Sequence, residues 1–180
     1  TGFNLNPTVE YPGLGSILSY EQPEPYSELP QNIAINMAGE KAGILGIPFD
    51  PFNVSNAQRK VDNLDMVRGL DQERVGRRVN LLKDHDKFFR SKLGMEDYYV
   101  DGHHAVIDDA LELMKSEDKA AFSVDDEPES VREAYGNGRF GQGCMMARRL
   151  VEQGVKYVEV SQNGWDTHDD NFTRSKELMG

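Results

Sequence analysis

Asp166 and His168 are the residues whose types and spacing fit chemistry best. They lie two positions apart in the segment 164–168 (GWDTH), shortly after the β-branched run at 155–160. In open α/β sheets, ligands bind outside the carboxyl ends of the strands. In an extended chain, side chains two positions apart point the same way. A carboxylate and an imidazole presented in this manner can share one divalent metal ion.

The same segment also has a purely structural interpretation. Thr167, followed three positions later by Asp170, matches a capping box in which Thr167 caps a helix and Asp170 sits in the first turn. Capping is the more common outcome for such a pattern, and it can coexist with metal binding. The sequence leaves both interpretations open.

A second cluster combines His103 and His104 with nearby aspartates. Adjacent histidines on a helix point about 100° apart, so they diverge from a shared ion. Aspartates also collect at helix starts, where the helix dipole is positive. We therefore expect a solvated helix start here, without a metal ion.

Arg139 is a candidate for oxyanion binding, because a guanidinium group can pair with phosphate or sulfate through two N–H groups. It lies just before a helix predicted from Phe140. Arg148 and Arg149 near the end of that helix are explained more simply by the helix dipole. Cys144 has apolar neighbours and no adjacent base, which predicts a core residue and not a nucleophile.

The elements that must position these residues follow from apolar periodicity, glycine and proline. We expect an irregular start over 1–13, a long loop over 38–57, and strands at 32–37 and 155–160. Helices are predicted at 14–20, 71–93, 105–115, 128–135 and 140–153.

A helix, a glycine and then a β-branched strand form the αβ half of an α/β unit. The predicted fold class is therefore α/β, with both strands in one mostly parallel sheet and the 140–153 helix packed on a face. Residues 71–135 should form a helical insertion outside the sheet. Its predicted buried residues are Val75, Val79, Leu82, Phe89, Leu111, Met114 and Tyr135.

Composition limits the class of protein. A chain of 180 residues can bury roughly 70% of its unfolded surface, which allows one domain with a sizeable core. The net charge of −11 argues against nucleic acid or an anionic membrane as partner. The single cysteine excludes an intrachain disulfide, and there is no signal peptide and no apolar run long enough for a membrane helix. The start at Thr1 suggests a processed or partial chain.

Four stretches carry a family resemblance. They are 11–20 (YPGLGSILSY), then 43–52 (GILGIPFDPF), then 139–155 (RFGQGCMMARRLVEQGV), and finally 164–171 (GWDTHDDN). In this order and spacing, the chain resembles the family called domain of unknown function 1501, a sulfatase-like branch of the alkaline phosphatase superfamily. The resemblance covers essentially the whole chain.

The resemblance implies that residues 1–180 are the central part of one alkaline-phosphatase-like domain, with the helical insertion at 71–135. Its sheet would be mostly parallel and flanked by helices. Upstream and downstream segments of the family would hold the nucleophile and most metal ligands, so the catalytic residues stay unassigned in this chain. Family members usually carry a twin-arginine signal, which implies an exported protein, periplasmic or extracellular.

The function implied is a metal-dependent, sulfatase-like hydrolase of phosphate or sulfate esters, acting on a small-molecule ester. Asp166 and His168 would hold one divalent ion, zinc or a calcium- or magnesium-like ion. Arg139 and Asn171 would contact the substrate. The alternative is a non-catalytic binding or assembly protein that keeps the fold, with a larger assembly as its partner and no need for tightly bound metal.

Overall fold

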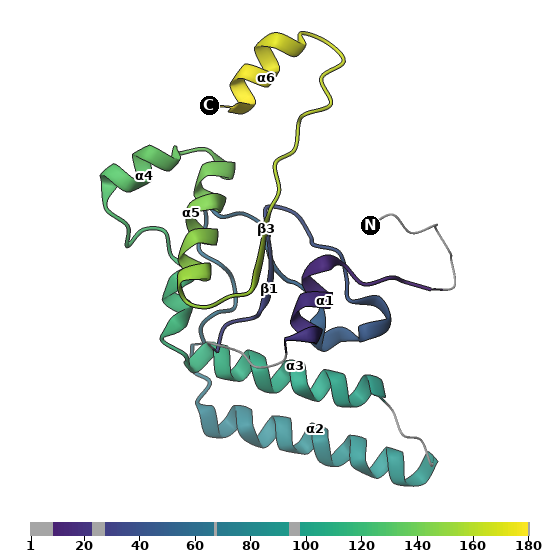
Figure 1. Cartoon of the computed structure of the whole chain (residues 1–180). Coiled ribbons are helices and arrows are strands. Elements are labelled where there is room, and N and C mark those ends of the chain that lie inside the picture. Colours follow the sequence, from purple (N-terminus) through teal and green to yellow (C-terminus); the bar gives the residue numbers. More distant parts are fainter. Residues whose placement is uncertain (1–8, 23–27, 67, 94–97, 180) are drawn as a thin grey trace.

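A computed structural model of the chain describes residues 9–22, 28–66, 68–93 and 98–179. The irregular start predicted over 1–13 therefore lies partly outside the described residues. The chain has an α/β fold with a small parallel sheet (Figure 1). In chain order the elements are α1 (Leu14–Glu21), β1 (Asn32–Ile35), η1 (Gly43–Leu45), η2 (Ile47–Phe49), β2 (Phe52–Val54), α2 (Gln72–Leu93), α3 (Tyr98–Lys115), η3 (Asp118–Phe122), α4 (Glu129–Tyr135), α5 (Arg139–Glu152), β3 (Tyr157–Val160) and α6 (Asn171–Met179).

The sheet has the strand order β2-β1-β3, and both pairings are parallel. The two predicted strands are thus neighbours in one parallel sheet, with Ile35 opposite Val160. Every residue of the central strand β1 is buried, as expected for a parallel strand covered on both faces. β2 falls inside the predicted loop over 38–57, because three residues are too few to show an alternating pattern.

Helices cover both faces of the sheet, with α1 and α5 on opposite sides of β1 and β3 in Figure 1. Each helix approaches the sheet through a glycine. A Cβ atom on Gly15 of α1 would lie 2.5 Å from Cδ1 of Tyr157, and one on Gly143 of α5 would lie 2.8 Å from Cγ1 of Val160. The predicted packing of the 140–153 helix on the sheet is confirmed.

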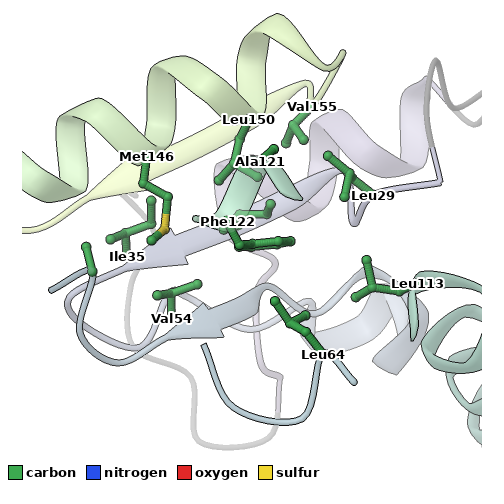
Figure 2. Packing of buried hydrophobic residues seen from close by; sticks show 12 residues of the cluster. Leu29, Ile35, Val54, Leu64, Leu113, Ala121, Phe122, Met146, Leu150 and Val155 are labelled. Atoms are coloured by element: carbon green, nitrogen blue, oxygen red, sulfur yellow. The ribbon is translucent and has the colours of Figure 1, made fainter. Parts of the chain in front are cut away.

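The hydrophobic core lies between α5, the sheet and η3 (Figure 2). Ile35 of β1, Met146 and Leu150 of α5 are fully buried. Phe122 of η3 and Leu113 of α3 complete this core, although the sequence analysis did not single them out. α3 is therefore anchored to the core through its C-terminal end.

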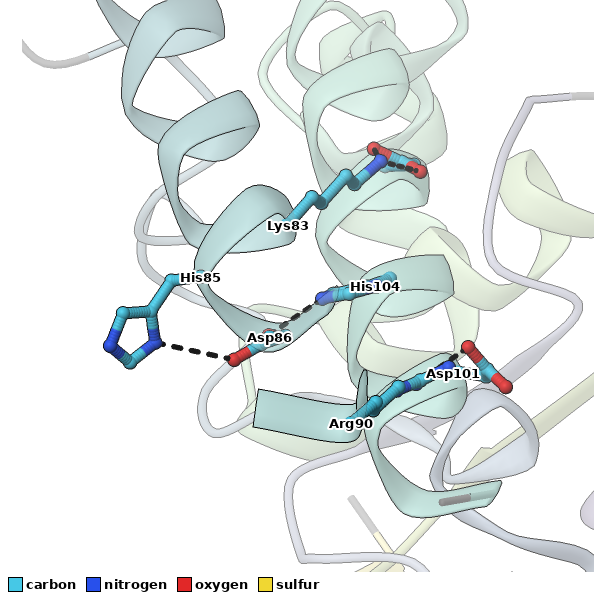
Figure 3. Close-up of polar contacts among 7 residues, drawn as sticks. Lys83, His85, Asp86, Arg90, Asp101 and His104 are labelled. Atoms are coloured by element: carbon cyan, nitrogen blue, oxygen red, sulfur yellow. Dashed lines mark hydrogen bonds and ion pairs between the residues drawn. The ribbon is translucent and has the colours of Figure 1, made fainter. Parts of the chain in front are cut away.

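The described residues between 71 and 135 form helices and turns and contain no strand. α2 is joined to α3 mainly by polar contacts, among them ion pairs from Lys83 to Asp108 and from Arg90 to Asp101 (Figure 3). α2 therefore forms an outer layer that does not reach the core.

This placement corrects two burial predictions. Leu82 is 42% exposed and Phe89 is 50% exposed, because the face of α2 that carries them is not covered by another described element. The other five predicted core residues of this region are half-buried: Val75, Val79, Leu111, Met114 and Tyr135.

Candidate functional site

The carboxyl ends of β1 and β3 border a cavity of about 440 Å³. Asn36 follows β1, and Ser161 continues β3 by donating its N–H to the Ile35 carbonyl at 3.0 Å. The start of α5 and the end of α6 close the other sides. The lining residues are Asn36, Tyr135, Gly136, Gly138, Arg139, Phe140, Gly141, Ser161, Gln162, Asn163, Glu177 and Leu178.

Asn36 holds this edge of the sheet together through its side-chain hydrogen bonds, and this role was not predicted from the sequence. The residue is 5% exposed and has a left-handed backbone with φ of 74°. Its Nδ2 donates to the Arg139 carbonyl at 3.1 Å, and its Oδ1 accepts from the Ala57 N–H at 3.3 Å. An asparagine directly after a short apolar strand was the available signal, since asparagine tolerates the left-handed region better than most residues.

Arg139 lines the cavity and also ties three segments together. Its Nε donates to Oδ1 of Asn36 at 3.2 Å. Its Nη2 donates to the backbone carbonyls of Asn36 and Ser55. Two of its three guanidinium nitrogens are thus engaged in holding the start of α5 against the ends of β1 and β2. Among the described residues, none accepts a hydrogen bond from Nη1.

Gly141 explains why α5 can begin so close to the end of α4. A Cβ atom on Gly141 would lie 1.8 Å from the Tyr135 carbonyl oxygen, and the backbone would have to move to relieve this clash. Gln142, between Gly141 and Gly143, donates from Nε2 to the Gly136 carbonyl at 2.7 Å. The motif therefore positions α4, α5 and the cavity wall.

Asp166 and His168 contact each other in the loop between β3 and α6. Nε2 of His168 lies 2.9 Å from Oδ1 of Asp166, and the side chains are 86% and 85% exposed. The two side chains thus lie together, as their spacing suggests. In the described part of the chain, neither lines the cavity beside β3.

The pair has the right atoms for a divalent metal ion but is not a complete site. Neighbouring ligands of a tetrahedral zinc ion lie about 3.3 Å apart, so the 2.9 Å pair would need only a small separation. Zinc sites in proteins use at least three protein ligands. Among the described residues, no group of three or more His, Cys, Asp or Glu side chains is placed to hold a metal ion.

α6 folds back on this loop. Nε2 of Gln162 donates to the Leu178 carbonyl at 2.6 Å, and a Cβ atom on Gly164 would lie 3.2 Å from Cδ2 of Leu178. Figure 1 shows the loop and α6 projecting away from the sheet. Trp165 is 52% exposed and Phe172 is 91% exposed. This arm therefore presents aromatic surface beside Asp166 and His168.

The start of α6 differs from the predicted capping box. The helix begins at Asn171, so Asp170 occupies the position before it, and Oδ1 of Asp170 accepts from Oγ1 of Thr173 at 2.8 Å. Thr167 does not cap the helix; its hydroxyl pairs with Oδ1 of Asn171, which also accepts from Oγ of Ser175 at 3.0 Å. Asn171 thus serves the helix start in this structure.

His103 and His104 both lie within α3, which starts seven residues earlier than predicted. Nε2 of His104 lies 2.8 Å from Oδ2 of Asp86 on α2 (Figure 3). His103 is exposed. Cys144 is half-buried, and burial raises the pKa of its thiol.

Two further findings concern the chain as a whole. No described helix is both long and apolar enough to cross a membrane. A family described as "Protein of unknown function (DUF1501)" matches residues 1–180. Neither the curated proteins nor the solved structures gave a significant match.

Proposed function

The chain belongs to the DUF1501 family over residues 1–180, and on this premise we propose that it is part of a metal-dependent, sulfatase-like hydrolase of phosphate or sulfate esters. In this proposal, Asp166 and His168 are two ligands of one divalent ion, zinc or a calcium- or magnesium-like ion. The nucleophile and the remaining ligands come from outside the described residues. An alkaline-phosphatase-like arrangement and export from the cytoplasm belong to the same proposal.

One observation carries the proposal: the 2.9 Å contact between His168 and Asp166 on the segment that leaves the carboxyl end of β3. This edge of a parallel sheet is where open α/β folds bind ligands. Both side chains are almost fully exposed, so a third ligand can reach them without rearranging a core. A bound ion would polarise an ester oxygen and offset its negative charge.

The residues of this chain would contribute binding and position. Arg139 lines the neighbouring cavity and can offer Nη1 to an anionic group, while its other donors keep α5 in place. In this structure Asn171 faces the Thr167 and Ser175 hydroxyls. A substrate contact from Asn171 would require it to exchange one of these bonds.

A second candidate function is a non-catalytic binding or assembly role. The exposed Trp165 and Phe172 favour it, because aromatic side chains are enriched in protein interfaces. Both functions place the arm that contains α6 against another surface. They differ in whether Asp166 and His168 bind metal.

Metal analysis of the protein purified from its native host separates the two functions. We expect bound divalent metal, and about a tenfold or greater loss of affinity in Asp166→Asn and His168→Gln. Asp169→Asn is the matched control, because Asp169 is exposed in the same loop and, among the described residues, its carboxylate forms no ion pair with His168. Hydrolysis of p-nitrophenyl phosphate and p-nitrophenyl sulfate should fall with the metal.

Unchanged metal content in Asp166→Asn would contradict the assignment of Asp166 as a ligand. If Asp166→Asn leaves the metal content unchanged and lowers the free energy of unfolding, the contact between Asp166 and His168 stabilises the loop before α6 and does not serve metal binding. The ligand assignment would then be wrong, and the assembly function would be favoured.

A further inference from the structure

A second and larger cavity, of about 690 Å³, lies at the opposite edge of the sheet. It borders the first residues of β1 and β2, Asn32 and Phe52, and is walled by α1, η2 and α3. Neither Asp166 nor Arg139 contributes to it. Any ligand bound there would be independent of the candidate metal pair.

The floor of this cavity is apolar and partly buried. Leu29 and Leu113 are 3% and 6% exposed, and Phe52 packs against Phe122 of the core. Ile47, Pro48 and Phe49 of η2 form the wall that faces α3, close to Gly102. This surface suits the hydrocarbon part of a ligand.

The titratable side chains that line the cavity are four carboxylates and one histidine. The carboxylates are Glu28, Asp50, Asp109 and Glu112, and none of the lining residues is Lys or Arg. Among the described residues, these four carboxylates form no ion pair with Lys or Arg, whereas Asp108, next to Asp109 on α3, pairs with Lys83. The cavity thus concentrates negative charge that the chain does not neutralise.

Burial and the crowding of these carboxylates affect the pKa of Asp109. Burial, followed by repulsion from Glu112 and Asp108, raises the pKa of the Asp109 carboxyl. A nearby cation would reverse this shift, because an opposite charge favours the ionised carboxylate.

Two buried polar atoms on residues lining the cavity also have no partner. Oε1 of Gln31 and Oγ of Ser19 are inaccessible to solvent and make no hydrogen bond among the described residues. The other end of the Gln31 amide is fixed, since Nε2 donates to the Leu29 carbonyl at 2.7 Å. Oε1 can only accept, so it adds an unsatisfied acceptor to the residues that line the cavity.

We propose that this cavity binds a small organic amine, with its ammonium group at the Asp109 and Glu112 wall and its apolar body on the floor formed by Leu29, Phe52 and Leu113. The acceptors and carboxylates exclude an anionic ligand. A neutral ligand of the same shape would provide no positive charge to pair with the carboxylates.

Isothermal titration calorimetry of the purified protein tests this with three probes of one shape: phenethylamine, 2-phenylethanol and phenylacetate. We expect phenethylamine to bind at least about tenfold more tightly than the alcohol, and phenylacetate not to bind. Asp109→Asn should weaken amine binding about fivefold or more, whereas Asp84→Asn, an exposed residue of α2 outside the cavity, should not.

Ala110→Phe provides a second test, because a bulky side chain at this lining position should fill the cavity and abolish amine binding. Equal binding of amine and alcohol, or amine binding that survives both Asp109→Asn and Ala110→Phe, would overturn the proposal. Absence of binding at millimolar phenethylamine would overturn it as well. N-acetylarginine amide, added as a fourth probe, distinguishes a basic side chain of a peptide from a free amine as the source of the cation.

Discussion

At the scale of single residues, Asn36 and Arg139 decide whether the carboxyl edge of the sheet keeps its shape. Asn36 uses both ends of its amide, and Arg139 reaches two backbone carbonyls as well as that amide. These bonds connect the ends of β1 and β2 with the start of α5. A ligand site at this edge depends on them even if neither residue touches the ligand.

Two substitutions at Asn36 separate its hydrogen bonds from its backbone conformation. Asn36→Ala loses the amide and must hold a φ of 74° without it, so we expect a loss of about 2–4 kcal/mol in the free energy of unfolding. Asn36→Gly loses the same bonds but is not strained, so it should cost about 1–2 kcal/mol less than Asn36→Ala. Urea unfolding measures both. Equal losses would show that the left-handed backbone is not a significant cost.

Glu127 is a carboxylate whose charge should matter for stability at acid pH. Its Oε1 lies 2.6 Å from Nη1 of Arg149 and 2.6 Å from Nη2 of Arg148, and its side chain is 12% exposed. The hydrogen bond from Arg149, then that from Arg148, lowers the pKa of the Glu127 carboxyl. The contact joins the segment before α4 to α5.

Because the pKa is lower in the folded state, Glu127 stabilises the protein fully above the unfolded value of about 4.3 and progressively less as the pH falls through the folded value. We therefore expect Glu127→Gln to be less stable than the wild type at pH 7, with the difference shrinking below about pH 4. Urea midpoints across this range provide the measurement. Glu129→Gln, at an exposed position, is the control, and a similar pH trend in it would contradict the assignment to Glu127.

At the scale of elements, two helical glycines have opposite roles. A Cβ atom on Gly141 of α5 would lie 1.8 Å from the Tyr135 carbonyl oxygen, whereas one on Gly76 of α2 would meet nothing within 4 Å. We expect Gly141→Ala to destabilise by roughly 2 kcal/mol or more, because α4 and α5 must separate. Gly76→Ala should stabilise by about 0.5–1 kcal/mol through helix propensity. Thermal unfolding of both variants tests this, and similar effects would show that α5 does not approach α4 so closely.

The elements that sequence predicted best are those with long local patterns. The helix over 140–153 and the strand over 155–160 form as predicted, with starts within one or two residues. The start of α3 was placed too late, because Tyr98 and Tyr99 precede the apolar periodicity. β2 was missed, since its partner β1 lies about twenty residues away and only tertiary pairing reveals a three-residue strand.

At the scale of the whole molecule, sequence could not predict which apolar stripes are covered. Leu82 and Phe89 lie on a regular stripe of α2, yet both are exposed because α2 meets α3 through ion pairs at the edge of the molecule. Phe122 is buried although it lies in a short turn with no periodicity. Burial in these cases depends on the position of the element in the fold, which local sequence periodicity does not predict.

The candidate site, like the core, was predicted only in part from the sequence. The sequence identified Asp166, His168 and Arg139 by residue type, and it identified the edge of the sheet from the order of helix and strand. It did not identify Asn36 or the cavity at the opposite edge, because both depend on neighbours distant in sequence. In the described arm, the Asp166 side chain is exposed to solvent.

The central claim is that Asp166 and His168 share a metal ion in the protein as its host makes it. The most direct measurement is an anomalous difference map, collected at the zinc edge from crystals of that protein grown with zinc. We expect one peak within about 2.0–2.2 Å of both an Asp166 carboxylate oxygen and Nε2 of His168, with at least one further protein ligand. A map with no peak there, and with the two side chains still hydrogen-bonded to each other, would contradict the claim.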